Sequence, residues 1–378
     1  MNIYQINIKD SKEFLKNLKV QGAGVEIMSK KMELLTFFIK DLKTPAVNIL
    51  KQDALSIGAE LAVPSGVILC QDEYYDSLLI GTKKQIEILS QKELSQPFGL
   101  KKLAKELREF LKTKEFPTQI MGVINANDDS FFAGSRFRDD RAIFQIEEMI
   151  ENGADIIDIG AVSSRPNADI VEVDEELERT KYICDIIKKR ELYKKVSFSI
   201  DSFNPKVIKY ALESGFNIIN DITGARDDEV VELAIDYNAK LCIMHMQGTP
   251  QTMQQNPTYS DVMVEISDFF QKQIQKCEAL GLSRDNIILD VGIGFGKKLE
   301  HNLTLIRNMK HFKKFGCPIL VGASRKSMID HIVPTPIEER LAGTLSIHLK
   351  SLENGASIIR CHDVKEHFQA IKVWERLS

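Results

Sequence analysis

The chain has 378 residues, of which 43% are hydrophobic and 28% charged, and its formal net charge is −4. This composition is ordinary for a globular protein of two domains, or of one large domain with an appendage, and it excludes a disordered chain. The slightly negative charge gives no bulk electrostatic reason to bind nucleic acid or an anionic membrane, so we expect neither partner.

The sequence shows none of the usual signs of export. The N-terminus has no basic start followed by an apolar core, and no apolar run approaches the roughly 20 residues that span a bilayer. The six cysteines form no CxxC pair, and several fall inside expected strands or helices. We therefore expect reduced, buried thiols in a cytoplasmic protein, without a disulfide framework or a zinc site.

Residues 1–115 predict a small α/β N-terminal appendage. Its expected elements, in chain order, are a strand at 3–8, helices at 11–19, 31–43 and 46–62, strands at 67–70 and 77–81, a linker at 95–99 and a charged linker helix at 100–112. Gly22 and Gly24 lack the third glycine and the preceding strand of a dinucleotide-binding loop, so we assign them no function. We expect the appendage to cap the second domain; regulation, dimerisation or binding of another enzyme are the alternatives.

From residue 116 to 378, short apolar runs alternate with segments of helical period. Eight strands are expected at 119–125, 155–160, 196–201, 217–222, 241–246, 286–291, 319–322 and 357–361. The expected helices are 142–152, 173–190, 205–214, 228–237, 261–280, 302–314, 337–353 and 365–376. Such alternation is typical of parallel strands covered by helices. The number of units and the length of about 250 residues favour a (β/α)8 TIM barrel over an open doubly wound sheet.

Polar residues follow the strands of this predicted barrel, at the end where barrel enzymes carry their chemistry. They are Asn125, Ser164, Arg165, Asp201, Asn220, Asp221, His245, Asp290, Ser324, Arg325, Lys326, Arg360 and His362. Any one of them could be structural, but polar groups at all eight strand ends are costly to bury without a ligand. Carboxylate, amide and ammonium groups suit a flat amide-like heterocycle, whereas arginine and histidine suit an anion such as a phosphate.

Strand parity groups some of these residues further, because side chains alternate across a strand. Asp290 shares a face with Ile288, and Arg360 shares a face with Ile358. The glycine-rich stretch LDVGIGFGK at 289–297 is not a phosphate-binding P-loop, because no serine or threonine follows its Gly-Lys pair. Within it, Phe295 is expected either as an exposed aromatic platform or as part of the core.

The motifs around these residues resemble the dihydropteroate synthases of the pterin-binding superfamily. They are GVINANDDSF (122–131), GADIIDIGAVSSRP (153–166), SIDS (199–202), NIINDITG (217–224), MHMQGTPQTMQQNP (244–257), LDVGIGFGK (289–297), VGASRKSMI (321–329) and RCHDV (360–364). The resemblance covers residues 116–377 and leaves the N-terminal segment outside the usual family core. It implies the condensation of 6-hydroxymethyl-7,8-dihydropterin diphosphate with p-aminobenzoate, which releases diphosphate and 7,8-dihydropteroate.

The resemblance also implies roles for individual residues. The pterin would be held by Asp201, Asn220, Asp290 and Lys326, with Met244 packed on its face. Arg360 and His362 would bind the diphosphate, and Asn125 would ligate the Mg²⁺ that the diphosphate carries. The aminobenzoate pocket would be lined by Ser324, Phe295 and the backbone near Lys326, beneath a mobile loop that contains Ser163, Ser164 and Arg165. The reaction would follow a dissociative, SN1-like path, and the barrel would form a homodimer through its late helices.

The chain departs from the family pattern in two loops. Where the first loop usually carries a second aspartate, this chain has Ala133, so catalysis must do without that group or use Asp128 or Asp129; we place Asp129 among the catalytic residues with Lys326, Arg360 and Arg165. In the second loop Ala161 and Val162 replace glycine and glutamate, and Ser164 replaces threonine.

Three other functions compete with the synthase. A methyltetrahydrofolate-dependent methyltransferase would share the pterin carboxylates but would not need Lys326, Arg360 and His362 for a diphosphate. A non-catalytic pterin-binding protein would fit the altered first loop. The third alternative is an aldolase-like barrel, in which Lys326 would form a Schiff base with the substrate. The residues around Lys326 suit amide recognition better.

Overall fold

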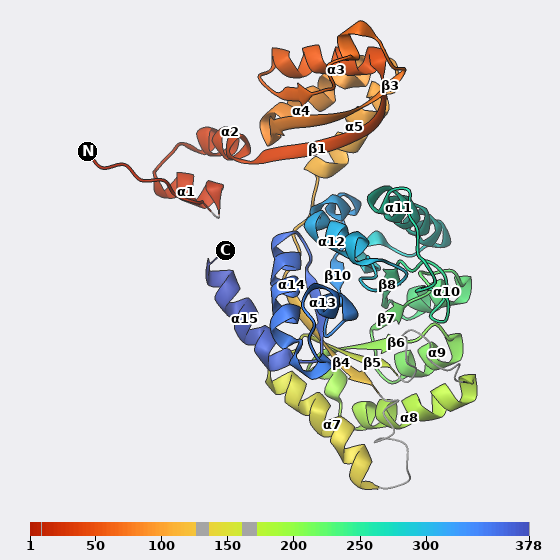
Figure 1. Ribbon diagram of the computed structural model, residues 1–378. Helices are drawn as coiled ribbons and strands as arrows, with labels where there is room; N and C mark the ends of the chain where they lie inside the picture. The colour runs from red at the N-terminus through yellow and green to blue at the C-terminus, as the bar shows by residue number, and fades with distance from the viewer. Residues whose placement is uncertain (9, 126–135, 161–171, 378) are drawn as a thin grey trace. The chain divides into compact units, whose positions relative to one another are not determined.

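The computed structural model describes residues 1–8, 10–125, 136–160 and 172–377, with the backbone alone for 136–141. The chain divides into two compact units, Met1–Thr113 and Lys114–Leu377 (Figure 1). The division falls after Thr113, whereas the sequence suggested a boundary after residue 115. Among the described residues, no helix is long and apolar enough to cross a membrane.

The first unit is a three-stranded antiparallel sheet with helices, in the strand order β1-β3-β2. Its elements are α1 (Ser11–Asn17), α2 (Gly22–Met32), β1 (Leu34–Lys43), α3 (Thr44–Ser56), β2 (Glu60–Ala62), η1 (Val67–Leu69), β3 (Tyr74–Thr82), α4 (Lys83–Lys92), η2 (Glu93–Ser95) and α5 (Leu100–Leu111). A hydrophobic core lies between the sheet and the helices and includes Leu50, Leu79, Ile86 and Leu107.

Several predictions for this unit are wrong. Residues 31–43 do not form one helix, because LLTFFIK pairs as β1 with β3 over most of its length. The helix expected at 46–62 ends at Ser56, and β2 follows it. Residues 3–8 form no strand, and the strand expected at 67–70 is the short 3₁₀ helix η1. Finally, α5 is not a linker, since its residues Leu100, Ala104 and Leu107 are buried.

The second unit is a closed barrel of eight parallel strands, in the order β10-β11-β4-β5-β6-β7-β8-β9. Its strands are β4 (Gln119–Asn125), β5 (Ile156–Gly160), β6 (Ser197–Asp201), β7 (Ile218–Asp221), β8 (Lys240–Met244), β9 (Ile287–Asp290), β10 (Ile319–Val321) and β11 (Ile358–Cys361). This closure confirms the predicted TIM barrel and excludes the open doubly wound sheet.

Helices surround the barrel (Figure 1). They are α7 (Arg136–Glu151), α8 (Val173–Lys189), α9 (Pro205–Glu213), α10 (Asp228–Asp236), α11 (Val262–Leu280), α12 (Leu299–Arg307), α13 (Ser327–Ile332), α14 (Leu341–Glu353) and α15 (Val364–Leu377), with the 3₁₀ turns η3 (Leu192–Lys194), η4 (Arg284–Asn286), η5 (Met309–Phe315) and η6 (Ile337–Glu339). The helix α13 was not expected from the sequence, and the helix predicted at 302–314 is divided into α12 and η5.

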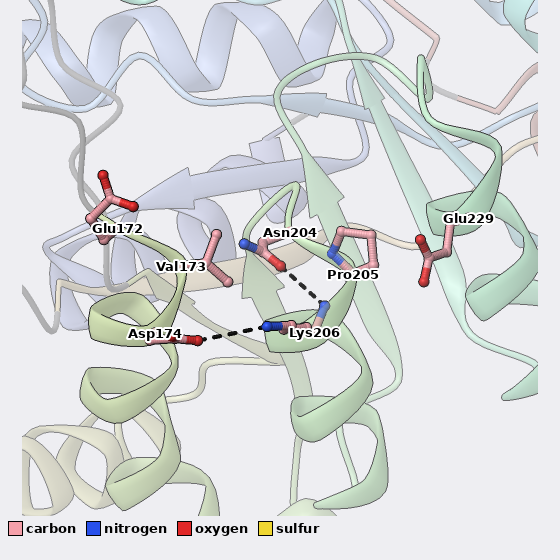
Figure 2. Close-up of a pocket in the computed structure, with 7 residues that line it drawn as sticks. All are labelled: Glu172, Val173, Asp174, Asn204, Pro205, Lys206 and Glu229. Carbon is pink, nitrogen blue, oxygen red and sulfur yellow. Dashed lines mark hydrogen bonds and ion pairs between the residues drawn. The ribbon is translucent and has the colours of Figure 1, made fainter.

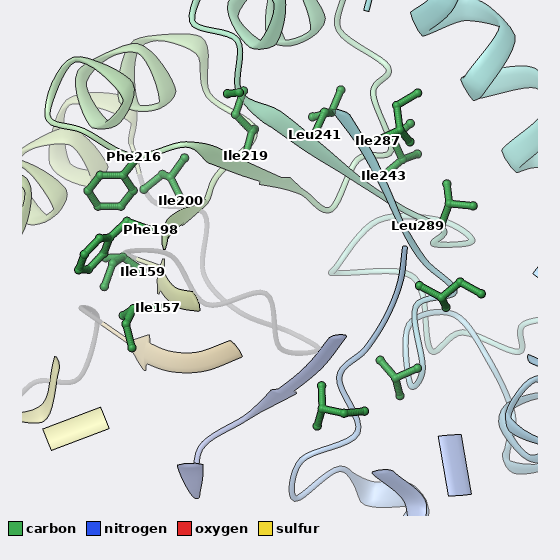
Figure 3. Packing of buried hydrophobic residues seen from close by; sticks show 14 of the residues in the cluster. Ile157, Ile159, Phe198, Ile200, Phe216, Ile219, Leu241, Ile243, Ile287 and Leu289 are labelled. Atoms are coloured by element: carbon green, nitrogen blue, oxygen red, sulfur yellow. The ribbon is translucent and has the colours of Figure 1, made fainter. Parts of the chain in front are cut away.

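Alternation along the strands explains both layers of the barrel core. Outward side chains pack beneath the helices; Figure 3 labels nine of them, from Ile157 on β5 to Leu289 on β9, together with Phe216, which precedes β7. Inward side chains fill the barrel axis with an apolar layer of Met121, Ile156, Ile218, Cys242, Ile288, Leu320 and Ile358. Because side chains alternate, the residue two positions after each of these also points inward, one layer nearer the carboxyl ends of the strands.

The cysteine prediction holds for five of the six thiols. All six cysteines are free, and Cys184, Cys242, Cys277, Cys317 and Cys361 are buried. Cys70, in the first unit, is exposed and departs from the expectation.

Candidate active site

A second, polar layer of inward side chains lies on the carboxyl-terminal side of the apolar layer of the barrel. The inward positions two residues beyond the apolar layer are Val123, Asp158, Asn220, Met244, Asp290, Gly322 and Arg360, four of which are polar or charged, and Asp201 ends β6 opposite Asn220 of β7. A protein places such groups in a barrel interior at a cost in free energy, which hydrogen bonds and ligands must offset. The layer is therefore the candidate site.

Arg360 connects three strands of this layer. Its Nε donates to Asp158 Oδ2 at 2.7 Å, and its Nη2 donates to Asp201 Oδ2 at 2.8 Å. The amide of Asn220 donates to the same Asp158 oxygen at 3.1 Å. The other oxygen of Asp158 is buried and has no hydrogen-bond partner among the described residues, so within this part of the chain the carboxylate retains unused acceptor capacity.

Two carboxylates of the layer, Asp201 and Asp290, have a raised pKa. Burial raises the pKa of Asp201 to about 7, against the attraction of Arg360 and with added repulsion from Asp158. Burial also raises the pKa of Asp290, although its Oδ1 accepts a hydrogen bond of 2.7 Å from the Gly292 amide. Perturbed carboxylates of this kind are typical of binding and catalytic sites.

Lys326 is the principal ammonium group at this site. Its Nζ donates to the carbonyl of Ile293 and lies 4.1 Å from the centroid of the Phe295 ring. Burial lowers the pKa of Lys326 to about 7, opposed by the negative charge of Asp290 and assisted by the positive charge of Arg360. A small change in local charge can therefore switch this lysine between its neutral and charged forms.

The burial of the Phe295 side chain is intermediate between the two expectations. Its ring is half-buried and packs against the cluster of Ile222, Met244, Met246 and Met253. It is therefore neither a fully exposed platform nor a core side chain. Met244 itself is 2% exposed.

The glycine-rich segment after β9 lies close to the segment after β8. A Cβ on Gly292 would lie 2.0 Å from the His245 carbonyl oxygen, and the residue has a φ of +67°. Lys297 Nζ contacts His245 Nδ1 at 3.1 Å and donates to the carbonyl of Phe295 at 2.9 Å. Burial lowers the pKa of Lys297 to about 7 and that of His245 to about 3. His245 thus serves chiefly to anchor this segment.

A second polar pair lies after β10 and β11. Ser324 Oγ lies 2.9 Å from His362 Nδ1, and Arg325 forms an ion pair of 2.5 Å with Asp363. These contacts bring the predicted anion-binding residue His362 next to Ser324, which the resemblance assigned to the aminobenzoate pocket.

Nine of the predicted site residues are described at this end of the barrel: Asp201, Asn220, Met244, Asp290, Phe295, Ser324, Lys326, Arg360 and His362. Asn125, the predicted metal ligand, ends β4 and is half-buried. Asp221 is used locally, because its carboxylate accepts from the amides of Thr223 and Ala225. The predictions for Asp128, Asp129, Ala133, Ser163, Ser164 and Arg165 lie outside the described residues.

Sequence reasoning missed Asp158 and Lys297. Asp158 is hidden within the apolar run DIIDIG, but its position two residues after the inward-facing Ile156 marks it as a member of the polar layer. Lys297 ends the rejected P-loop and the motif LDVGIGFGK, but no signal in its spacing indicated that it would be buried.

A surface pocket of about 390 Å³ lies apart from the polar layer, where α8, α9 and α10 begin (Figure 2). Its described lining includes the carboxylates Glu172, Asp174 and Glu229, and Lys206 is the one cation among these described residues. Lys206 is moreover 3.7 Å from Asp174, so this pocket does not suit a diphosphate.

Comparison with known proteins agrees with this geometry. The pterin binding enzyme family matches residues 121–362. The bifunctional dihydropteroate synthase/dihydropteroate reductase of Helicobacter pylori is 42% identical over 100% of this chain and 99% of its own length. The dihydropteroate synthase of Haemophilus influenzae is 41% identical over 68% of this chain and 93% of its own length.

A solved structure supports the same relationship. The dihydropteroate synthase of Yersinia pestis, in complex with a sulfonamide drug, aligns with a TM-score of 0.64 and 36% sequence identity. The alignment covers 69% of this chain and 94% of the Yersinia chain. The chain therefore belongs to the pterin binding enzyme family and, within it, to the dihydropteroate synthases.

Proposed function

We propose that this chain condenses 6-hydroxymethyl-7,8-dihydropterin diphosphate with p-aminobenzoate to form 7,8-dihydropteroate and diphosphate. The observation that carries the proposal is the polar layer, where acceptors for a flat amide lie beside a guanidinium and a buried lysine. Few substrates need both features, and a pterin that carries a diphosphate is one of them. The methyltransferase alternative explains the acceptors but not the cations.

The pterin is held in the polar layer in this proposal. The Asp201 and Asp290 carboxylates accept hydrogen bonds from ring and amino N–H groups, which a carboxylate can do in parallel pairs. Asn220 and Lys326 donate to the ring carbonyl and ring nitrogens. Met244 supplies a polarisable apolar surface for the flat ring.

The diphosphate lies toward Arg360 and the Ser324–His362 pair. Asn125 at the end of β4 offers an amide oxygen, and oxygen is the ligand atom that Mg²⁺ prefers. Among the described residues, no group of three or more His, Cys, Asp or Glu could hold a metal by itself. This fits a Mg²⁺ ion that arrives largely bound to the substrate phosphates, and such an ion neutralises charge on the leaving group.

The reaction breaks the bond between the pterin methylene carbon and the diphosphate oxygen, and the electron pair leaves with the diphosphate. The electron-rich pterin stabilises the resulting cation. The neutral amine of p-aminobenzoate then attacks the methylene carbon and loses a proton. No side-chain nucleophile is required, so the protein acts by positioning, by stabilising the leaving group and by excluding water. In this proposal Phe295 and Ser324 line the aminobenzoate pocket, whereas the roles predicted for Asp129, Ser163, Ser164 and Arg165 lie outside the described residues.

The decisive experiment measures diphosphate release and dihydropteroate formation with Mg²⁺, while each substrate is omitted in turn. We expect both products only when both substrates are present, and a loss of activity in Asp201→Ala, Lys326→Ala and Arg360→Ala. Arg284→Ala is the matched control, since Arg284 lies in η4 before β9 and pairs with Glu278. Full activity in the three site variants would refute the assignment, and tight pterin binding without turnover would favour a non-catalytic pterin-binding protein.

A second candidate function is reduction of dihydropteroate. The similarity to the Helicobacter protein, whose name includes a dihydropteroate reductase, extends over the first unit, whereas the Haemophilus synthase covers only 68% of this chain. The step adds a hydride and a proton across the N5=C6 bond of 7,8-dihydropteroate and needs a reduced nicotinamide or a reduced flavin as donor. The test follows tetrahydropteroate formation in the full chain with each donor in turn; its absence with both would exclude this activity.

We further propose a homodimer formed through the late helices of the barrel. Apolar side chains are exposed there, including Ile332 at 51%, Val333 at 59% and Val373 at 56%. Light scattering should give twice the mass of the chain, and Val333→Asp with Val373→Asp should lower it to that of one chain.

The free cysteines support a cytoplasmic location, because disulfides are rare in that compartment.

A further inference from the structure

Three side chains on one face of α14 and its N-terminal flank hold the loop that joins β10 to α13. Arg340 Nη1 donates to the carbonyl of Arg325 at 3.1 Å. The Thr344 hydroxyl accepts from the amide of Arg325 at 3.0 Å. His348 Nε2 accepts from the amide of Ala323 at 3.0 Å. Because these residues are four apart in sequence, a helix presents them in a row. We name Arg340, Thr344 and His348 the α14 row.

The loop needs such support at Arg325. This residue has a φ of +57°, a conformation that residues other than glycine rarely adopt. Backbone of this kind persists only where the surrounding structure fixes it. Here the amide and the carbonyl of Arg325 are both held by the α14 row, and its guanidinium is held by Asp363. Ser324 and Lys326, the two site residues of this loop, are its immediate neighbours.

A buried pair of histidines extends the support to the segment after β11. Because the Ala323 amide can only donate, His348 Nε2 is unprotonated and its proton lies on Nδ1. That proton is donated to His367 Nε2 at 2.8 Å, and His367 Nδ1 donates to the carbonyl of Asp363 at 2.6 Å. Both rings are 1% exposed, and burial keeps the pKa of His348 well below its usual range.

We propose that the α14 row acts as a set of positioning residues for the synthase reaction. It fixes the loop that carries Ser324 and Lys326 and, through His367, ties this loop to Asp363, the neighbour of His362. None of its members belongs to the polar layer, so they act through the residues that they hold. This inference rests on the proposed function, since it assigns the loop to the binding of the pterin diphosphate.

The test uses the full chain and a hydroxyl that can be removed without a change of shape. Thr344→Val keeps the volume but leaves the Arg325 amide without its acceptor, whereas Thr344→Ser restores the acceptor. Ser351→Ala is the matched control, because Ser351 is also buried on α14 and its hydroxyl donates to the carbonyl of Ile347 in the same helix. The readouts are kcat, the KM of each substrate, the Kd for inorganic pyrophosphate and the melting temperature.

We expect Thr344→Val to lower kcat/KM roughly tenfold to a hundredfold, as misplacement of binding groups does, and to weaken pyrophosphate binding. Thr344→Ser and Ser351→Ala should remain close to the wild type. A lower melting temperature with unchanged kinetic constants and pyrophosphate affinity would overturn the proposal, because the row would then serve stability alone.

The failure of the proposed function gives a different result: the wild type itself would form no dihydropteroate. In that case the pyrophosphate affinities of Thr344→Val and the wild type still test the positioning role. Should Thr344→Val not fold, His348→Gln and His348→Leu give the same comparison, since glutamine keeps an acceptor for the Ala323 amide and leucine does not. Equal kinetic constants and equal pyrophosphate affinity in these two variants would overturn the proposal.

Discussion

Arg360 and Asp158 form an ion pair inside the barrel, with Arg360 Nε 2.7 Å from Asp158 Oδ2. The two residues lie on β11 and β5, which flank β4 on either side. The Asp158 side chain is fully buried, and that of Arg360 is 22% exposed. Asp158 therefore holds the guanidinium of Arg360 from its buried side, and part of the guanidinium stays exposed to a ligand. An arginine that binds an anion needs this geometry.

The first prediction removes this support. Asp158→Asn keeps the size of the side chain but takes away the charge that orients Arg360. We expect kcat/KM for the pterin diphosphate to fall about a hundredfold, with a loss of roughly 3 kcal/mol in the free energy of unfolding. Steady-state kinetics and chemical denaturation measure the two effects.

Asp155→Asn is the control for this variant, because Asp155 precedes the same strand and its Oδ2 accepts from the Ile120 amide at the opposite end of the barrel. It should leave kcat/KM near the wild-type value. An active Asp158→Asn enzyme would mean that Asp201 alone orients the guanidinium.

The second prediction concerns pH. The pKa of Asp201 is raised to about 7, so below that pH the carboxyl gains a proton and loses acceptor capacity for the pterin. The pKa of Lys326 is lowered to about 7, so above that pH the ammonium loses its charge. The kcat/KM for the pterin diphosphate, which reports the free enzyme, should therefore follow a narrow bell with its maximum near pH 7.

Lys326→Arg separates the two limbs of this bell. Arginine stays charged at every pH of the assay, so the alkaline limb should disappear while the acidic limb remains, even if overall activity falls. Lys350→Arg changes an exposed lysine on α14 and should retain the wild-type profile. Persistence of the alkaline limb in Lys326→Arg would assign it to another group, such as Lys297.

Local sequence pattern predicted the barrel and which of its site residues share a strand face with an apolar residue. Each strand is a short apolar run, and Asp290 and Arg360 point inward because Ile288 and Ile358, two residues earlier, fill the barrel axis. The same parity would have found Asp158, but the apolar run around it looked like uninterrupted core. The bridge from Arg360 to Asp158 and Asp201 depends on closure of the barrel between residues far apart in the chain, which no local pattern contains.

The first unit was harder to predict for a related reason. The segment LLTFFIK fits a helix or a strand equally well, and only its pairing with β3, in which Leu34 lies opposite Thr82, makes it a strand. Short apolar runs are ambiguous in this way whenever a distant partner decides their conformation. The α14 row was not predicted, because the helical period at 337–353 does not indicate which distant loop the helix contacts.

The third prediction tests the glycine-rich segment after β9. Gly292→Ala places a Cβ 2.0 Å from the His245 carbonyl oxygen, so the segment that carries Phe295 and Lys297 must shift. We expect a loss of at least about a hundredfold in kcat/KM and a lower melting temperature. Gly316→Ala is the control, because Gly316 also has a positive φ, +70°, but has open space around it. It should cost about 1 kcal/mol of stability and leave the kinetics unchanged.

The last prediction concerns a buried acid in the first unit. Glu93 is fully buried, and in the part of the chain that the structure describes neither of its carboxylate oxygens has a hydrogen-bond partner. Burial, with repulsion from Asp53, raises its pKa to about 7 from the model-compound value of 4.5. The folded unit thus binds a proton more tightly than the unfolded chain does, so its stability should fall as the pH rises from about 4.5 to about 7.

Glu93→Gln removes the charge that becomes costly above this range, and it should stabilise the first unit at pH 8 by on the order of 1 kcal/mol while having little effect at pH 5. Hydrogen exchange of peptides from α4 and α5 reports this unit separately from the barrel. Glu106→Gln, an exposed change on α5, should alter exchange at neither pH. Faster exchange at pH 8 in Glu93→Gln than in the wild type would contradict this prediction. It would show that a contact stabilises the ionised carboxylate, and that ionisation of Glu93 does not lower the stability of the first unit.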